Sequence, residues 1–254
     1  MSSGKPRAVS KPTVTGGAAP VKSSVRQTAP TTKRGQDPLK RWLGIAALVF
    51  VLAGTFRYLD TIKERWYIFD PTALHNLALA SIALHPNDTR AVVNNIVTSL
   101  LETHGSQHIN VRQDEWVFNN AGGAMGAMYL IHASITEYLI IFGTPLGTEG
   151  HSGRHTADDY FMILEGEEWA FPAGALEKEV YPKGTVNLMK RGEVKQYKMH
   201  VGCFALEYAR GWIPPMLPFG LMDAFFSTLD FWTLVDTFHF TGREMIRNLL
   251  IGKI

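Results

Sequence analysis

An apolar run near the amino terminus is the first regular feature of the chain. The fifteen residues from Trp42 to Phe56 carry no charge. As a helix they would reach about 22 Å, short of the ~30 Å hydrocarbon core of a bilayer. Arg57 could lengthen the span by extending its side chain toward the membrane interface, and Tyr58 could lie at that interface. A buried soluble helix is the alternative for a run this short.

The charges around this run favour the membrane. Residues 1–41 hold nine Lys or Arg and one acid, which leaves 16 basic and 22 acidic residues for the rest of the chain. A basic tail fits nucleic acid or an anionic membrane surface, but the apolar run that follows it favours the membrane. We therefore expect no nucleic-acid partner, an anchor over residues 41–60, a cytoplasmic tail and a folded domain on the far side.

Before the anchor, residues 1–40 are mostly Ser, Thr, Pro, Gly, Ala and Lys. Such a segment cannot bury enough apolar surface to offset its ordering entropy, so we expect a disordered tail. It does not have the pattern of a cleaved signal peptide, because the apolar run starts too far along the chain.

Helical periodicity follows the anchor. Apolar residues spaced three and four apart predict helices over 71–84 and 89–104, with a turn at His85–Asp88 between them. Both helices are expected to pack rather than to carry chemistry, within a helical segment over residues 61–115.

The centre of the chain, residues 116–213, has the pattern of strands. Short apolar segments end at glycines, and no helical pattern separates them. The expected strands include Tyr138–Phe142, Tyr160–Leu164, Gln196–Met199 and Cys203–Tyr208. Many short strands with regular turn signals predict an antiparallel sandwich or barrel.

Residues 214–254 return to helix. Prolines mark a break, and two helical patterns follow over Phe219–Phe226 and Leu229–Leu250. Ser227–Asp230 between them fits a capping box. Their broad apolar face suits packing against the barrel and lying in a membrane interface equally well.

Three places hold candidate chemistry. The glycines of Trp116–Gly126 lack the spacing of a nucleotide loop, so a close backbone crossing is expected there. His151 and His155 would stand about 13 Å apart along one strand, too far to share a metal ion.

Glu207 is the third place. Alternation puts Glu207 on one face of its strand together with Cys203. Cys203 is the single cysteine, so it cannot form an intrachain disulfide and is expected to be a small buried strand residue. If that face points inward, burial raises the pKa of Glu207. A rim ion pair with Arg210 is the alternative.

Several long segments of the chain resemble one family, the fungal C-8 sterol isomerases and their animal relative, the sigma non-opioid receptor. The resemblance runs from about Tyr58 to the end. It rests on Trp116–Met128, Leu130–Tyr138, Phe142–Gly147, Gly150–Arg154, Leu206–Pro214 and Phe226–Asp230. Ala157–Phe161 and Gly211–Gly220 are similar to the enzyme branch.

The resemblance implies a mainly β fold with flanking helices. It implies a cupin-like β-barrel over residues 116–213, one amino-terminal transmembrane helix, and two carboxyl-terminal amphipathic helices lying on the lumenal face of the endoplasmic reticulum membrane. It also suggests a homo-oligomer, a trimer in the receptor branch.

The reaction that the resemblance implies moves a sterol double bond from the delta-8 to the delta-7 position, the fecosterol to episterol step of ergosterol synthesis. It needs no redox cofactor and no metal. A proton adds at carbon 9, a cation forms at carbon 8, and a base removes a proton from carbon 7. Carboxyl groups in an apolar barrel can act as acid, base and counter-charge.

By resemblance, Glu207 is the carboxylate that faces the cation. In the receptor branch a second acid stands at the position that Phe161 occupies in this chain. Alternation puts Asp159 on the same face as Phe161, so Asp159 is favoured as the inward partner of Glu207, and Asp158 is kept as the other candidate. The expected substrate-binding residues are Tyr138, Trp116, Met128, Phe142, Phe161 and His132. Structural hydrogen bonding is an alternative for His132 and Glu137. The alternative functions are a non-catalytic, sigma-receptor-like binding protein and, less favoured, a metal-dependent cupin enzyme.

Overall fold

A computed structural model describes residues 38–254 of the chain, which divides into two units, residues 1–52 and 53–254. The tail predicted over residues 1–40 lies outside the described residues except for its last three, which begin a helix.

The first helix, α1, runs from Pro38 to Ile62 and continues as a 3-10 turn, η1, over Lys63–Trp66. Its 25 residues span about 37 Å, enough for a ~30 Å hydrocarbon core. Within residues 38–254 it is the one helix long and apolar enough to cross a membrane. The predicted run at Trp42–Phe56 lies inside it, and the helix gains its extra length at both ends.

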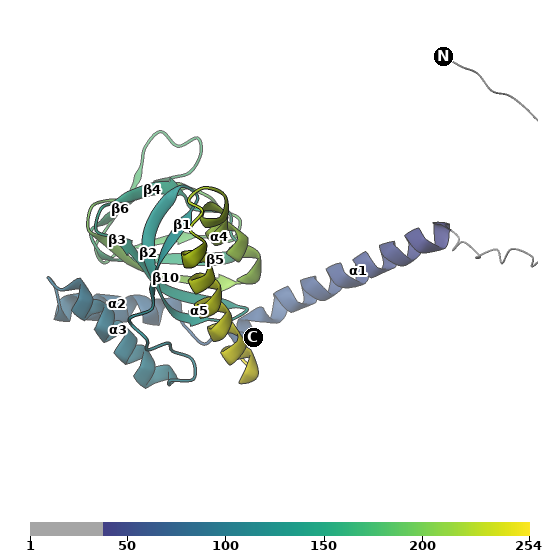
Figure 1. The fold of residues 1–254 in the computed structure, drawn as a ribbon, viewed down its shortest axis with the longest axis horizontal. Coiled ribbons are helices and arrows are strands. Elements are labelled where there is room, and N and C mark those ends of the chain that lie inside the picture. The colour runs from purple at the N-terminus through teal and green to yellow at the C-terminus, as the bar shows by residue number, and fades with distance from the viewer. Residues whose placement is uncertain (1–37) are drawn as a thin grey trace, which may run out of the picture. The chain divides into compact units, whose positions relative to one another are not determined.

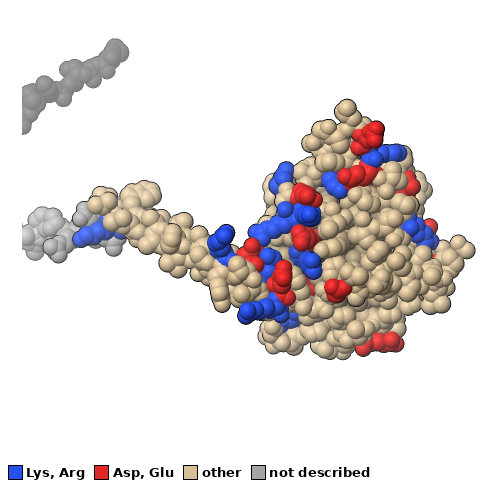
Figure 2. Space-filling view, turned by 180° about the vertical axis from the view of Figure 1, so that it is seen from behind, with Lys and Arg blue, Asp and Glu red and all other residues tan. Residues whose placement is uncertain are grey.

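Polar contacts surround the carboxyl-terminal end of α1. Asp60 forms ion pairs with Lys63 at 3.1 Å and Arg191 at 2.7 Å, and Trp212 Nε1 donates to it at 2.9 Å. Figure 2 shows charged side chains of both signs gathering around this end of the helix.

Two further helices have the predicted bounds. They are α2 at Pro71–Leu84 and α3 at Thr89–His104. Each begins after an aspartate whose side chain accepts from a backbone N–H of the first turn: Asp70 from Ala73 at 2.8 Å, and Asp88 from Ala91 at 3.0 Å.

The strands form two antiparallel sheets that close a barrel (Figure 1). The larger sheet has the order β1-β2-β3-β10-β5-β8, and the smaller has the order β4-β9-β6-β7. The strands are β1 (Trp116–Ala121), β2 (Ala124–Ala133), β3 (Glu137–Thr144), β4 (Thr148–His151), β5 (Ala157–Glu165), β6 (Glu167–Phe171), β7 (Glu179–Pro182), β8 (Val186–Met189), β9 (Gln196–Met199) and β10 (Cys203–Gly211). The predicted antiparallel barrel is confirmed.

The larger sheet is buried on both faces, because α2 and α3 cover its outer face. Alternation along β10 separates the two cores. Cys203 and Ala205 belong to the core inside the barrel, whereas Leu206 and Tyr208 belong to the core under the helices. The predicted faces of this strand are therefore confirmed, as is the buried position of Cys203.

The chain leaves β10 through a short 3-10 turn, η2 (Pro214–Met216), and ends in α4 (Leu217–Phe226) and α5 (Phe231–Leu250). These two helices lie along one side of the barrel, against β1 and β2 (Figure 1). The predicted capping box was wrong. Asp230, not Ser227, caps α5, since it accepts from Thr233 N at 3.1 Å and the chain turns at Leu229 with a positive φ of 54°.

Candidate functional site

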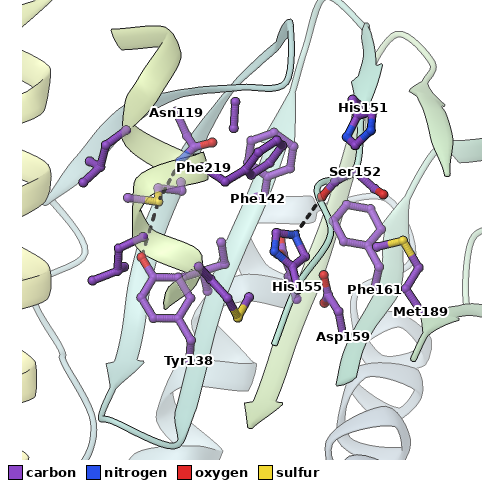
Figure 3. A pocket seen from close by; sticks show the side chains of 18 of the residues that line it. Asn119, Tyr138, Phe142, His151, Ser152, His155, Asp159, Phe161, Met189 and Phe219 are labelled. Atoms are coloured by element: carbon purple, nitrogen blue, oxygen red, sulfur yellow. Dashed lines mark hydrogen bonds between the residues drawn. The ribbon is translucent and has the colours of Figure 1, made fainter. Parts of the chain in front are cut away.

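The interior of the barrel holds a cavity with about 930 Å³ of empty space, its mouth included. Most of the side chains around it are apolar. Four of the predicted binding residues line it: Tyr138, Met128, Phe142 and Phe161. Figure 3 shows Asp159, Phe161 and Met189 on one side of the cavity and Tyr138 on the other. A space of this size and lining suits an apolar ligand.

Three carboxyl groups face this cavity. Glu207 comes from β10, Asp159 from β5 and Glu168 from β6. In the β5–β10 register Glu207 lies opposite Phe161, and Asp159 lies opposite Ala209. Glu207 and Asp159 are therefore diagonal neighbours on the inner face, with backbones roughly 7–8 Å apart.

The surroundings favour the protonated forms of these acids. Burial raises the pKa of Asp159, whose Oδ1 atom has no hydrogen-bond partner among the described residues. Burial also raises the pKa of Glu168. The pKa of Glu207 lies well above its ordinary value because of burial and the nearby charges of Asp159 and Glu168. Such groups can hold protons near neutral pH and deliver them.

Asp158, the other candidate, does not line the cavity. Successive residues of a strand point to opposite faces, so Asp158 points away from the interior when Asp159 points in. Its side chain accepts from the backbone N–H of Arg191 at 2.9 Å, and Arg210 lies opposite it on β10.

Trp116 and His132 also lie away from the cavity. In β1 the inner face is formed by Asn119 and Ala121, so alternation leaves Trp116 on the outer face, where its ring is tilted against that of Tyr129 at a centroid separation of 5.8 Å. In β2 the register shifts between Leu130 and His132, which reverses the alternation.

After that shift His132 is fully buried on the outer side of the sheet. Its ring packs against Phe69, and Nδ1 contacts the carbonyl of His108 at 2.8 Å. Burial lowers the pKa of His132 to about 3. The ring is therefore neutral and its role in this position is structural.

Glu137 is a structural residue too. It is completely buried and accepts from Ile68 N, Phe69 N and the Tyr208 hydroxyl, and it pairs with Lys253 at 2.8 Å.

Glu168 was not predicted from the sequence. It follows Glu167 at the start of β6, and only 3% of it is exposed. Its carboxylate accepts from Asn187 Nδ2 at 3.2 and 3.3 Å. Period-two alternation over Glu167–Phe171, which puts Glu168 and Ala170 on one face, is the signal that could have found it.

The lining of the cavity also includes two histidines. His151 and His155 both line it, with Phe219 of α4 near each ring, at 6.2 and 5.4 Å. Each histidine has a nearby backbone partner: Gly153 N donates to His151 Nδ1 at 2.9 Å, and His155 Nε2 donates to Ser152 O at 2.7 Å. Over residues 38–254 no three His, Cys, Asp or Glu side chains are grouped to hold a metal ion.

The glycine-rich segment Trp116–Gly126 is a close backbone crossing, as predicted. Gly122 O accepts from His151 N at 2.9 Å. A Cβ atom on Gly150 would lie 2.6 Å from Ala124 N.

Fold and site together define a β-barrel that encloses an apolar cavity with buried carboxyl groups. The chain belongs to the family described as ERG2 and Sigma1 receptor like protein, which matches residues 46–253. The C-8 sterol isomerase erg2 of Aspergillus fumigatus is 57% identical over 92% of this chain and 99% of its own length. The sigma non-opioid intracellular receptor 1 of Gallus gallus is 35% identical over 84% of this chain and 91% of its own length.

Solved structures resemble the chain more distantly. An RmlC-like cupin from Shewanella frigidimarina is 14% identical, has a TM-score of 0.34, and covers 42% of this chain and 92% of its own. The two antiparallel sheets of this chain define its barrel.

Proposed function

We propose that this protein is a sterol isomerase that moves the ring double bond from the delta-8 to the delta-7 position, as in the conversion of fecosterol to episterol in ergosterol synthesis. The observation that carries the proposal is the group of three carboxyl side chains, Asp159, Glu168 and Glu207, in a cavity lined mostly by apolar side chains. Support also comes from relatives at 57% identity named C-8 sterol isomerase, against 35% for the receptor branch.

The reaction needs only proton transfer. A protonated carboxyl group adds its proton at carbon 9, and the electron pair of the double bond forms the new C–H bond. The cation that results at carbon 8 is neutralised when an ionised carboxyl group takes a proton from carbon 7. The electron pair of that C–H bond becomes the new double bond between carbons 7 and 8. One proton enters and one leaves, so no electrons are exchanged with a cofactor.

Glu207 and Asp159 are the proposed catalytic pair. They share the inner face of neighbouring strands, and the raised pKa of each lets it carry a proton near neutral pH. An ionised carboxylate in this dry interior also attracts the carbocation more strongly than it would in water.

The apolar walls would hold the sterol rings. The ring centroids of Phe142 and Phe161 lie 6.4 Å apart on the wall formed by β3, β10 and β5, and their ring faces can stabilise a cation nearby. Tyr138 and Met128 complete the contacts proposed for the substrate.

The substrate is dissolved in a bilayer, which suits a membrane-anchored enzyme. We propose that α1 is the anchor, with the tail in the cytoplasm and the barrel in the lumen of the endoplasmic reticulum, and that α4 and α5 rest on the membrane surface. Large apolar side chains on these two helices are exposed: Phe225, Phe226, Phe231, Trp232, Val235 and Phe238. A homo-oligomer remains part of the proposal, by resemblance to the receptor branch.

Expression in cells that lack sterol C-8 isomerase tests the function. The ratio of delta-7 to delta-8 sterols should rise with the wild-type protein, and should fall by roughly 100-fold or more with Glu207→Gln or Asp159→Asn. Asp158→Asn is the matched control, because it makes the same change one residue away but outside the cavity. If the wild-type chain makes no delta-7 sterol, the enzyme proposal fails. If Glu207→Gln keeps full conversion, that residue's role is ruled out.

A further inference from the structure

Polar side chains also gather on the side of the cavity opposite Asp159. Asn119 of β1 donates from Nδ2 to Met128 Sδ at 3.6 Å, and the Tyr138 hydroxyl of β3 donates to the same sulfur at 3.8 Å. Figure 3 shows the two dashed contacts in the space between Asn119 and Tyr138. All three side chains line the cavity. Two polar donors from different strands therefore converge on one point inside the barrel.

The sulfur of Met128 is a poor partner for both donors. A thioether accepts hydrogen bonds only weakly, whereas an N–H or O–H group away from water is stabilised by an oxygen acceptor. Asn119 and Tyr138 share this weak acceptor, so an oxygen atom brought between them would make a stronger contact with each. The pair is thus suited to hold an oxygen atom of a ligand.

Thr241 of α5 is a third polar side chain at this place. Only 4% of it is exposed, it lines the same cavity, and its Oγ1 atom has no hydrogen-bond partner among residues 38–254. Burial raises the pKa of Tyr138 to about 12, and the nearby Thr241 hydroxyl lowers it in part, so the two hydroxyls are neighbours. A buried hydroxyl without a partner costs free energy that a polar group of a ligand can recover. Asn119, Tyr138 and Thr241 are called the polar cluster below.

An alcohol matches the polar cluster better than other groups do. Its oxygen has two lone pairs, which can accept from Asn119 and Tyr138, and one hydrogen, which Thr241 Oγ1 can accept. A ketone or an ether has no hydrogen to give to Thr241, and an ammonium group has no lone pair for the two donors. The chemistry of the polar cluster therefore selects a hydroxyl group.

The strand register places the polar cluster close to the carboxyl groups. Tyr138 lies opposite Ala209 of β10, and Ile140 lies opposite Glu207. Tyr138 and Glu207 are therefore diagonal neighbours on the inner face, with backbones roughly 7–8 Å apart. Asp159 lies opposite Ala209 on the other side of β10, so two strand spacings, about 9–10 Å, separate its backbone from that of Tyr138. A rigid fused-ring molecule can reach the polar cluster and the acids at the same time.

We infer that the polar cluster is a binding subsite for an alcohol, and that it takes the carbon-3 hydroxyl of the sterol. This inference rests on the proposed function and adds to it. Asn119 and Thr241 become binding residues, and the Tyr138 hydroxyl gains a specific contact. The fused rings of a sterol are rigid, so a hydroxyl held here fixes where carbons 7 to 9 lie relative to Glu207 and Asp159. The subsite thus orients the substrate as well as binding it.

The first test compares a delta-8 sterol with its 3-deoxy analogue, in which a hydrogen atom replaces the hydroxyl. Wild-type protein, purified at full length in detergent, should have a kcat/KM about 100-fold higher for the alcohol, because the analogue loses three hydrogen bonds of ordinary strength. This comparison needs no variant. Wild-type protein that converts both compounds equally well overturns the inference and leaves the isomerase function standing.

Single variants of similar shape assign the three contacts. Asn119→Leu, Tyr138→Phe and Thr241→Val should each lower kcat/KM for the alcohol about fivefold and leave the value for the 3-deoxy analogue unchanged. A variant that only disturbed the fold would lower both values together. Thr237→Val is the matched control, because it makes the same change one turn earlier on α5, at another residue of the cavity. A loss of preference in Thr237→Val as large as that in Thr241→Val overturns the assignment of Thr241, and so does an unchanged preference in Thr241→Val.

The second test does not depend on catalysis. A saturated steroid alcohol and its 3-deoxy counterpart have no ring double bond to move, so displacement of the labelled alcohol measures binding alone. The wild-type protein should prefer the alcohol, and Thr241→Val should reduce that preference about fivefold. Comparing both proteins in one detergent cancels the different partitioning of the two steroids.

No preference in the wild-type protein, or an equal preference in Thr241→Val, overturns the subsite. If the wild-type protein makes no delta-7 sterol, the proposed function fails, and the binding of the saturated pair alone decides whether the polar cluster holds an alcohol.

Discussion

Glu137 is the buried group whose loss should affect stability most. Its carboxylate contacts three other parts of the fold: the segment before α2 through Ile68 and Phe69, strand β10 through Tyr208, and the end of the chain through Lys253. None of it is exposed. Glu137→Gln keeps the shape of the side chain but removes the carboxylate charge that pairs with the buried Lys253 ammonium, which then keeps only its hydrogen bonds to Thr136 Oγ1 and Ile254 O.

The magnitude follows from that unpaired charge. Breaking a buried ion pair by removing one partner costs about 3–5 kcal/mol. For a domain of this size each kcal/mol lowers the unfolding temperature by about 2–4 °C, so a decrease of roughly 10 °C is expected. Thermal unfolding of the full-length protein in detergent, followed by circular dichroism, measures it.

A double-mutant cycle gives the control. Lys253→Met combined with Glu137→Gln removes the unpaired charge and should recover a large part of the lost stability. The double variant should therefore lose less stability than the sum of the losses of the two single variants. A loss below about 1 kcal/mol for Glu137→Gln would refute this reasoning. A Glu137→Gln protein with normal stability but no isomerase activity would also refute it, because that result would give Glu137 a role in the reaction rather than in the fold.

Three other predictions concern the helices and the edge of the site. Asp230→Ala should cost about 1 kcal/mol of stability by removing the cap of α5, while Ser227→Ala should cost little; equal effects in thermal unfolding would contradict the assigned cap. The hydrogen bonds from Arg243 at 2.5 and 2.7 Å lower the pKa of Glu115, so the stability they provide should be complete above its ordinary value of 4.5 and vanish as pH falls through the lowered pKa. Unfolding temperatures of wild type and Glu115→Gln should therefore differ at neutral pH and converge in acid; a constant difference would refute this. Trp116→Leu should leave sterol conversion nearly unchanged, because that ring lies outside the cavity. A tenfold loss of conversion would show that Trp116 belongs to the substrate site.

Much of the fold could be predicted because its signals are local. The apolar periodicity of α2 and α3 gave their bounds, and alternation along β10 gave its two faces. Alternation along β5, which puts Asp159 on the same face as Phe161, pointed Asp159 inward. These features depend on neighbouring residues in the chain, which a sequence displays directly.

The failures come from contacts that local patterns do not carry. One extra residue in β2 turned His132 to the outer face, and a bulge has no clear mark in a single sequence. Glu168 was overlooked because its importance depends on Asp159 and Glu207, which are near it only after the barrel closes. Its hydrogen-bond partner, Asn187, comes from a further segment.

The central claim is that a carboxyl group of the cavity protonates the sterol at carbon 9. It is tested most directly by one turnover in deuterated water, with the purified protein in excess over a delta-8 sterol. The acidic protons of Glu207 and Asp159 exchange with solvent, so the delta-7 product should carry one deuterium at carbon 9, and Glu207→Gln should form little product. Delta-7 product without deuterium at carbon 9, or no conversion by the wild-type protein, would contradict the account.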